Sequence, residues 1–132
     1  MKVLDHANAR LMEEVYAAFT VGDVQKAAGY WTQDCVHYYP GKSRLAGAHA
    51  GIESALAFAG EMFEICQGRI QMEITEIGAS ENLAFATVLT RYEREDRKLE
   101  MPFINVARIE NGLIAEFWTY PDDQAAVDDF WA

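Results

Sequence analysis

Cysteine, basic residues and long apolar runs are all scarce in this sequence of 132 residues. The two cysteines, Cys35 and Cys66, lack the spacing of metal ligands and are too few for a disulfide framework, so we expect two buried thiols. Lysine and arginine together number 11 and aspartate and glutamate number 21, which gives a net charge of −10. A chain without a basic face binds phosphates poorly, which argues against nucleic acid and anionic membrane surfaces as partners.

No apolar run approaches the roughly 20 residues that a membrane-spanning helix requires. The first residues, MKVLDHANARLMEE, include acidic side chains and lack the apolar core of a signal peptide. We therefore expect a cytoplasmic protein with no membrane partner. Hydrophobic residues make up 51% of the chain, and its length suits one domain with a substantial core.

The strongest local signal is Asn111-Gly112, which lies between two alternating apolar runs in the stretch Met101–Pro121. Both residues tolerate positive φ, so the pair predicts a tight β-hairpin. If Arg108 and Glu116 lie on the same face of this hairpin, they can pair across its two strands. Asn105 then lies on the opposite, mostly apolar face, where an amide needs a partner or a ligand.

Apolar residues recur with the period of a helix in several other parts of the chain. Two helices are predicted on either side of the corner Gly22-Asp23, because glycine ends helices and aspartate caps them. Trp31 is expected to pack between these two helices. The predicted helices are Leu4–Val21 with Asp5 as N-cap, Val24–Tyr30, Ile52–Gln67, and a tail helix within residues 122–132.

Alternation of apolar and polar residues predicts further strands at Cys35–Pro40, at Arg69–Ile77 with a bulge near Ile77, and at Leu83–Glu93. We expect Cys35–Pro40 to be an edge strand, because it is short and ends at a proline, and Lys42–Ala50 to be a loop. Helices followed by a run of strands imply an α+β fold, with helices packed on one face of a curved, mixed or antiparallel sheet. Such a sheet encloses a cone, which can hold a ligand.

Several short motifs occur in the order and spacing of one known family. They are Gly22-Asp23, Trp31 with Gln33-Asp34, Tyr39-Pro40-Gly41, Leu45-Ala46-Gly47 with Gly51, and the ending NGLIAEFWTYPDDQAAVDDFW. With them the chain resembles the SnoaL-like and ketosteroid-isomerase-like branch of the nuclear transport factor 2-like superfamily. The resemblance implies one domain over residues 1–132, the cone-shaped, cystatin-like roll of that superfamily, and no cofactor. It implies no single reaction, because the superfamily includes isomerases, cyclases, dehydratases, epoxide hydrolases and non-enzymes.

The ketosteroid isomerases of this branch use a carboxylate base, a tyrosine on the first helix and a protonated aspartic acid on the penultimate strand. When this chain is aligned with that pattern, Tyr39 takes the position of the carboxylate base. Val15 takes the position of the tyrosine, and Asn105 takes the position of the aspartic acid. Tyr16 is one residue away, about 100° round the helix. A phenol with a pKa of about 10 is a poor base at neutral pH, which argues against ordinary ketosteroid isomerisation.

Two histidines are candidate acid–base groups, because imidazole titrates near neutral pH. His37 either enters the cone beside Tyr39 or is an exposed residue of an edge strand. His49 lies either at the mouth of the cone or on a surface loop. Together they make weak evidence for a metal site, since a third ligand is missing, and we predict none. Asn105 is either a donor to a ligand or a structural amide bonded to the backbone.

The residues predicted to be catalytic are His37, Tyr39, His49 and Asn105. Those predicted to line the ligand are Tyr16, Phe63, Met72, Phe103, Phe117 and Thr119. In this hypothesis one of the two histidines moves a proton, while the amide and the phenol stabilise an enolate or oxyanion. Glu73 and Arg91 are either a buried acid–base pair of the epoxide-hydrolase kind or a solvated cross-strand pair.

Trp118 and Tyr120 are expected on the outer face of the sheet, opposite Asn105. Exposed large aromatics usually mark a partner, so we expect a homodimer joined through this face. The sequence therefore supports three hypotheses. The chain is a cofactor-free enzyme that isomerises, cyclises, dehydrates or hydrolyses an apolar carbonyl compound, a non-catalytic module that binds a hydrophobic ligand, or a dimeric interaction protein.

Overall fold

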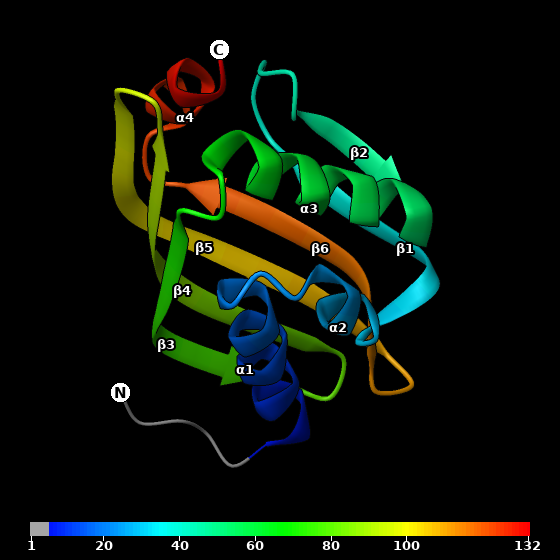
Figure 1. The fold of residues 1–132 in the computed structure, drawn as a ribbon. Coiled ribbons are helices and arrows are strands. Elements are labelled where there is room, and N and C mark those ends of the chain that lie inside the picture. Colours follow the sequence, from blue (N-terminus) through cyan, green and yellow to red (C-terminus); the bar gives the residue numbers. More distant parts are fainter. Residues whose placement is uncertain (1–5) are drawn as a thin grey trace.

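The computed structural model describes residues 6–132 and shows a curved sheet with helices on its concave face (Figure 1). The helices are α1 (Ala7–Thr20), α2 (Val24–Ala28), α3 (Ile52–Cys66) and α4 (Gln124–Trp131). The strands are β1 (Trp31–Tyr39), β2 (Gly47–Ala50), β3 (Ile70–Ala79), β4 (Leu83–Arg94), β5 (Arg97–Glu110) and β6 (Leu113–Pro121). The predicted helix start at Leu4 and cap at Asp5 lie outside the described residues.

The six strands lie in the order β2-β1-β6-β5-β4-β3. Strand β1 runs parallel to β6, and the other neighbouring strands are antiparallel, so the sheet is mixed. In Figure 1, α1, α2 and α3 all lie over one face of this sheet, while α4 lies at one end of it. The predicted α+β class, with helices on a curved mixed sheet, is confirmed.

The predicted hairpin at Asn111-Gly112 is confirmed. Asn111 has a φ of 51° and Gly112 a φ of 77°, which is the left-handed pair that a tight turn needs. Arg108 lies opposite Glu116, and its Nε donates to the Glu116 carboxylate at 2.7 Å. Asn105 lies on the other face of β5 and is only 5% exposed, so the hairpin directs an amide into the interior.

The prediction for the first strand was wrong in extent and in place. The strand begins at Trp31, four residues before the predicted start, so Trp31 lies in the sheet rather than between helices. It is also an interior strand, because Gly47–Ala50, predicted as part of a loop, forms the edge strand β2 beside it. The edge strand is four residues long and contains glycine and alanine, which have low β-propensity, so its sequence does not predict a strand. It forms only because it pairs with β1.

The remaining elements differ from their predicted ranges mainly at their ends. Helix α2 stops at Ala28, and Gln67 caps α3 in the left-handed conformation with a φ of 51°. The bulge in β3 lies between Ile74 and Glu76, slightly before the predicted position, because β4 shifts register there. Both cysteines are buried and unpaired, as expected. No helix within residues 6–132 is long and apolar enough to cross a membrane.

The tail helix α4 closes one end of the sheet. Asp123 caps it, accepting from the Ala126 N–H at 3.1 Å, and the side chain of Trp131 is fully buried. At its other end, Arg97 donates to the carbonyl oxygen of Ala132 at 2.6 Å, and Arg94 donates to that of Phe130 at 3.1 Å. Two cations at the C-terminus of a helix complement its dipole, so the tail is fixed to the body.

Candidate functional site

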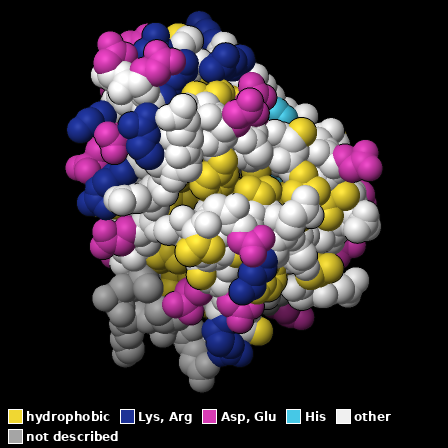
Figure 2. All heavy atoms as spheres, viewed as in Figure 1, with side chains coloured by type: hydrophobic (Ala, Val, Ile, Leu, Met, Phe, Trp, Pro, Cys, Tyr) yellow, Lys and Arg dark blue, Asp and Glu magenta, His cyan; other side chains and the backbone are white. Residues whose placement is uncertain are grey.

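A cavity lies between α1, α3 and the concave face of β1, β6 and β5. Apolar side chains gather in the hollow between α1 and α3, and charged side chains lie around its rim (Figure 2). About 60 Å³ of the cavity can hold the centres of water molecules. One water needs roughly 10–15 Å³ by that measure, so the cavity suits a small compound of about one ring. Eight of the ten predicted site residues line it: Tyr16, His37, Tyr39, Met72, Phe103, Asn105, Phe117 and Thr119.

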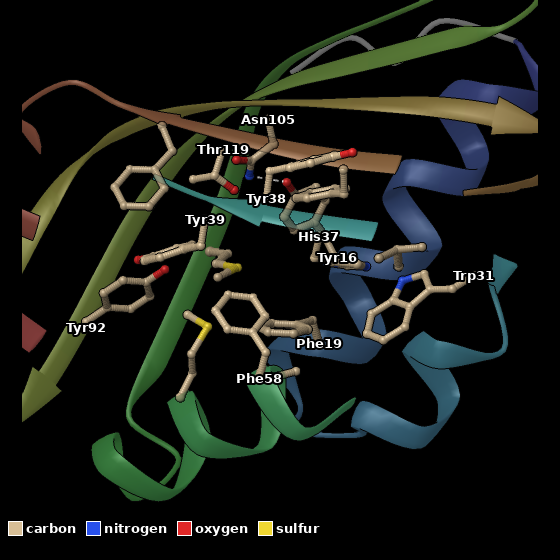
Figure 3. A pocket seen from close by; sticks show the side chains of 16 residues that line it. Tyr16, Phe19, Trp31, His37, Tyr38, Tyr39, Phe58, Tyr92, Asn105 and Thr119 are labelled. Atoms are coloured by element: carbon tan, nitrogen blue, oxygen red, sulfur yellow. Dashed lines mark hydrogen bonds between the residues drawn. The ribbon is translucent and has the colours of Figure 1, made fainter. Parts of the chain in front are cut away.

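Tyr16 and Asn105 form a hydrogen-bonded pair in the cavity wall (Figure 3). The Asn105 Nδ2 donates to the Tyr16 hydroxyl oxygen, which joins β5 to α1. Burial raises the pKa of Tyr16, so it remains a phenol over the whole physiological range. The sequence hypothesis paired Asn105 with Tyr39 for the stabilisation of an oxyanion, whereas the structure joins Asn105 to Tyr16. The family pattern placed Val15 at the position of the first-helix tyrosine. Val15 and Tyr16 both line the cavity, because a helix lying in a concave sheet exposes a wide face to it.

His37 enters the cavity and is only 8% exposed, which contradicts the alternative of an exposed edge-strand residue. Its ring lies 4.4 Å from that of Trp31 and 5.3 Å from that of Phe117, measured between centroids. Burial, and to a smaller extent the charge of His49, lowers the pKa of His37 to about 4. The imidazole is therefore uncharged at neutral pH.

Tyr39 lines the cavity as a neutral hydrogen-bonding group. Its hydroxyl oxygen accepts from the Trp131 Nε1 at 2.9 Å and from the hydroxyl of Tyr92. Burial raises the pKa of Tyr39 to about 12, and its hydrogen remains available for donation. A phenol with this pKa is not a base at neutral pH, in agreement with the argument against ordinary ketosteroid isomerisation.

Three buried side-chain polar atoms in residues 6–132 have no hydrogen-bond partner. They are Trp31 Nε1, His37 Nε2 and Asn105 Oδ1. All three belong to residues that line this one cavity, and none of the lining residues is Asp, Glu, Lys or Arg. A buried polar group without a hydrogen-bond partner destabilises the fold by about 1–3 kcal/mol. Such groups are therefore expected where a bound ligand can supply the missing hydrogen bond.

Comparison with known proteins identifies the family. The sequence profile of the SnoaL-like domain family matches residues 12–117. The chain belongs to the SnoaL-like domain family. The family includes cyclases and isomerases, so membership does not by itself select a reaction.

Relatives of this SnoaL-like chain match over almost the whole of their length. An uncharacterised protein of Mycobacterium tuberculosis is 24% identical over 97% of this chain and 98% of its own. The solved structure of Bal32a, from a soil-derived mobile gene cassette, has a TM-score of 0.91 at 25% identity and covers 96% of this chain and 97% of its own. The solved structure of a candidate SnoaL-like polyketide cyclase from Jannaschia has a TM-score of 0.79 at 14% identity. The match covers 96% of this chain and 92% of that protein. The resemblance inferred from the sequence motifs is thus confirmed.

Two residues that the sequence predicted for the SnoaL-like site are not brought to the cavity. His49 lies opposite His37 on the edge strand, but its Nε2 is 2.7 Å from the carbonyl oxygen of Leu45 and its ring stacks on Phe58 at 4.2 Å. Phe63 packs against Phe19 instead, with 4.9 Å between ring centroids. The side chains of α3 that line the cavity are Phe58, Ala59 and Met62. Phe63 lies one residue, or about 100°, beyond that face.

Two other predictions concern ionic sites. Glu73 and Arg91 lie 3.7 Å apart with side chains 65% and 38% exposed, so they form the solvated cross-strand pair and not a buried acid–base pair. Within residues 6–132, no three His, Cys, Asp or Glu side chains are grouped so that they could hold a metal ion.

The cavity lining also includes residues that the sequence analysis did not predict, among them Phe19, Trp31 and Phe58. For Phe58, the apolar stripe of α3 was the available signal.

Proposed function

We propose that this SnoaL-like chain binds a small apolar carbonyl compound in the cavity and converts it without a cofactor. The reaction would be an isomerisation, cyclisation, dehydration or hydrolysis that passes through an enolate or another oxyanion. The observation that carries the proposal is the Tyr16–Asn105 pair in a cavity whose walls are otherwise mostly apolar. We also propose the cytoplasmic location expected from the sequence.

The pair suits the stabilisation of negative charge on a ligand oxygen. The Tyr16 oxygen accepts from the Asn105 amide, so the Tyr16 hydrogen is free to point at a ligand. Donation by the amide also polarises the O–H bond, because hydrogen bonds in a chain strengthen one another. A donor held in place within a dry cavity stabilises a developing oxyanion more than water does.

His37 supplies the proton-moving group of the proposal. Its Nε2 has no partner within the protein, and a pKa of about 4 keeps it unprotonated at neutral pH. Such an imidazole is about as basic as an ordinary aspartate, whose pKa is about 3.9. A carboxylate is the base of ketosteroid isomerases. His37 can therefore replace the carboxylate that this chain lacks at Tyr39.

The test uses phenylacetone, a one-ring ketone with acidic hydrogens between ring and carbonyl. In heavy water, proton NMR should show that wild-type protein speeds the exchange of these hydrogens for deuterium. The His37→Phe and Asn105→Leu variants should lose most of this acceleration. A matched control is Thr90→Val, which removes a buried hydroxyl of β4 outside the cavity lining. If the His37→Phe variant exchanges these hydrogens at the wild-type rate, His37 does not move the proton.

A non-catalytic module that binds the same ligand is the second candidate. The lack of any carboxylate, lysine or arginine among the lining residues favours it, because efficient enolising enzymes place a charged base beside the substrate. Binding of phenylacetone without any acceleration of exchange in the wild type would select this candidate.

The partner proposed for the outer face of the sheet is a second copy of the chain. Phe85, Ile104 and Tyr120 are 46%, 47% and 53% exposed, and Tyr38 stacks on Trp118 with 5.4 Å between centroids. These residues lie on four neighbouring strands, β4, β5, β6 and β1. Exposed aromatic and aliphatic side chains on one sheet face can pair with the same face of a second copy across a two-fold axis.

A further inference from the structure

One part of the cavity is not used by the proposed carbonyl site. Trp31 opens β1 and is 4% exposed, and its indole nitrogen has no hydrogen-bond partner. The indole lies against His37, at 4.4 Å between ring centroids and with the two planes tilted by 60°. In Figure 3 the indole nitrogen lies on the edge of the ring that faces His37.

The chemistry of these two nitrogens restricts what can lie beside them. An indole N–H only donates, so its partner must carry an acceptor atom. An uncharged imidazole nitrogen donates or accepts, depending on its tautomer. The oxygen of a neutral hydroxyl group can accept from Trp31, which leaves the His37 Nε2 lone pair free for the proton transfer proposed above.

The charge of the ligand is restricted as well. No Asp, Glu, Lys or Arg side chain lines the cavity, so a carboxylate or an ammonium ion would be buried without a counter-ion. Such burial is strongly unfavourable. The low pKa of His37, caused by its burial, removes the one cation that this wall could have offered to an anionic ligand.

We propose that Trp31 is a specificity-determining residue that holds a second, neutral oxygen of the ligand beside His37. The ligand class is then a small neutral compound with two oxygen functions, one at Tyr16 and Asn105 and one at Trp31. This inference rests on the proposed function, since it describes another part of the same site. The register supports two separated oxygens, because His37 lies opposite Phe117 of β6 and Asn105 lies opposite Thr119. Two strand spacings across the sheet and two residues along it place their backbones about 12 Å apart.

Two ketones of nearly the same shape test this proposal. In 4-hydroxyacetophenone a hydroxyl group lies across the ring from the carbonyl, and in 4-methylacetophenone a methyl group takes its place. Calorimetry on the wild type should show that the hydroxyl compound binds about tenfold more tightly, which is the size of one net hydrogen bond. The Trp31→Phe variant keeps an aromatic ring but lacks the N–H, and should bind both compounds equally.

Tyr30→Phe is the matched control, because it removes a hydroxyl group next to Trp31 in sequence but outside the cavity lining. It should keep the tenfold difference. A second measurement needs no variant of Trp31. In the ¹⁵N–¹H spectrum of the wild type, the assigned indole signal of Trp31 should move with 4-hydroxyacetophenone much more than with 4-methylacetophenone.

The outcomes separate this inference from the proposed function. Equal affinities in the wild type, an unmoved Trp31 signal, or a difference that persists in Trp31→Phe would overturn the role of Trp31. Binding of 4-acetylbenzoate as tight as that of the hydroxyl compound would overturn the restriction to neutral ligands. In each case the proposed carbonyl site stands if 4-methylacetophenone still binds and loses affinity in Asn105→Leu. If neither ketone binds, both proposals fail.

Discussion

Replacing Asn105 with leucine separates ligand binding from folding. In the wild type, Nδ2 of Asn105 donates to Tyr16 while Oδ1 has no partner in the protein. Leucine removes one hydrogen bond, which stabilises the fold by about 0.5–1.5 kcal/mol, and it also removes one buried unpartnered acceptor, which costs about 1–3 kcal/mol. The two effects oppose each other, and leucine has the same number of side-chain heavy atoms as asparagine, with an adjoining cavity that can accept its slightly larger methyl groups. The free energy of unfolding should therefore change by less than about 1 kcal/mol.

Ligand affinity should respond differently from stability. Without the amide, the Tyr16 hydroxyl loses the donor that holds and polarises it. The loss of one well-placed donor in a dry site costs about 1–3 kcal/mol, which corresponds to a decrease in affinity of roughly 5- to 150-fold.

The assay pairs urea unfolding with calorimetric titration of phenylacetone on the same samples. Thr90→Val serves as the control, because Thr90 is buried on β4 and bonds to the Val88 carbonyl at 3.3 Å, outside the cavity lining. A loss of several kcal/mol in the unfolding free energy of Asn105→Leu, with unaltered affinity, would refute the donor role and make Asn105 a structural amide.

Three further predictions concern other parts of the molecule. Trp118→Glu places a charge on the outer sheet face and should convert the proposed dimer into a monomer in sedimentation velocity, and a monomeric wild type would contradict the interface. Small neutral ring ketones at 100 times their Kd should stabilise the protein by about 2.7 kcal/mol and raise Tm by several degrees, so unchanged melting across a library of such ketones would argue against a ligand cavity. The pKa of His37 falls from 6.5 to about 4 on folding, so the unfolded chain binds one more proton between these pH values. The contribution of uncharged His37 to the free energy of unfolding should be fully present above pH 6.5. The free energy of unfolding should decrease by up to about 3 kcal/mol as the pH falls to 4, and the His37→Phe variant should lack this decrease.

The sequence predicted those features that depend on neighbouring residues. Asn111-Gly112 specifies its turn because both residues accept a left-handed backbone, and the alternation around it then places Asn105 and Arg108 on opposite faces. The helix Ile52–Cys66 follows from its apolar period, and its end was predicted to within one residue, at Gln67. These local signals, together with the motif order, were sufficient for the α+β class and the family.

Only the tertiary structure decided which side chains meet in the cavity. Tyr16 and Asn105 are 89 residues apart, and no local pattern states that α1 turns this tyrosine toward β5. The parallel pairing of β1 with β6, which buries His37 and aligns it with Phe117, depends on where a long connection returns to the sheet. The same pairing makes β1 an interior strand, and β2 exists as an edge only because β1 is there to bond it. Local propensity fixes an element and its faces, whereas long-range pairing fixes which faces enclose the cavity.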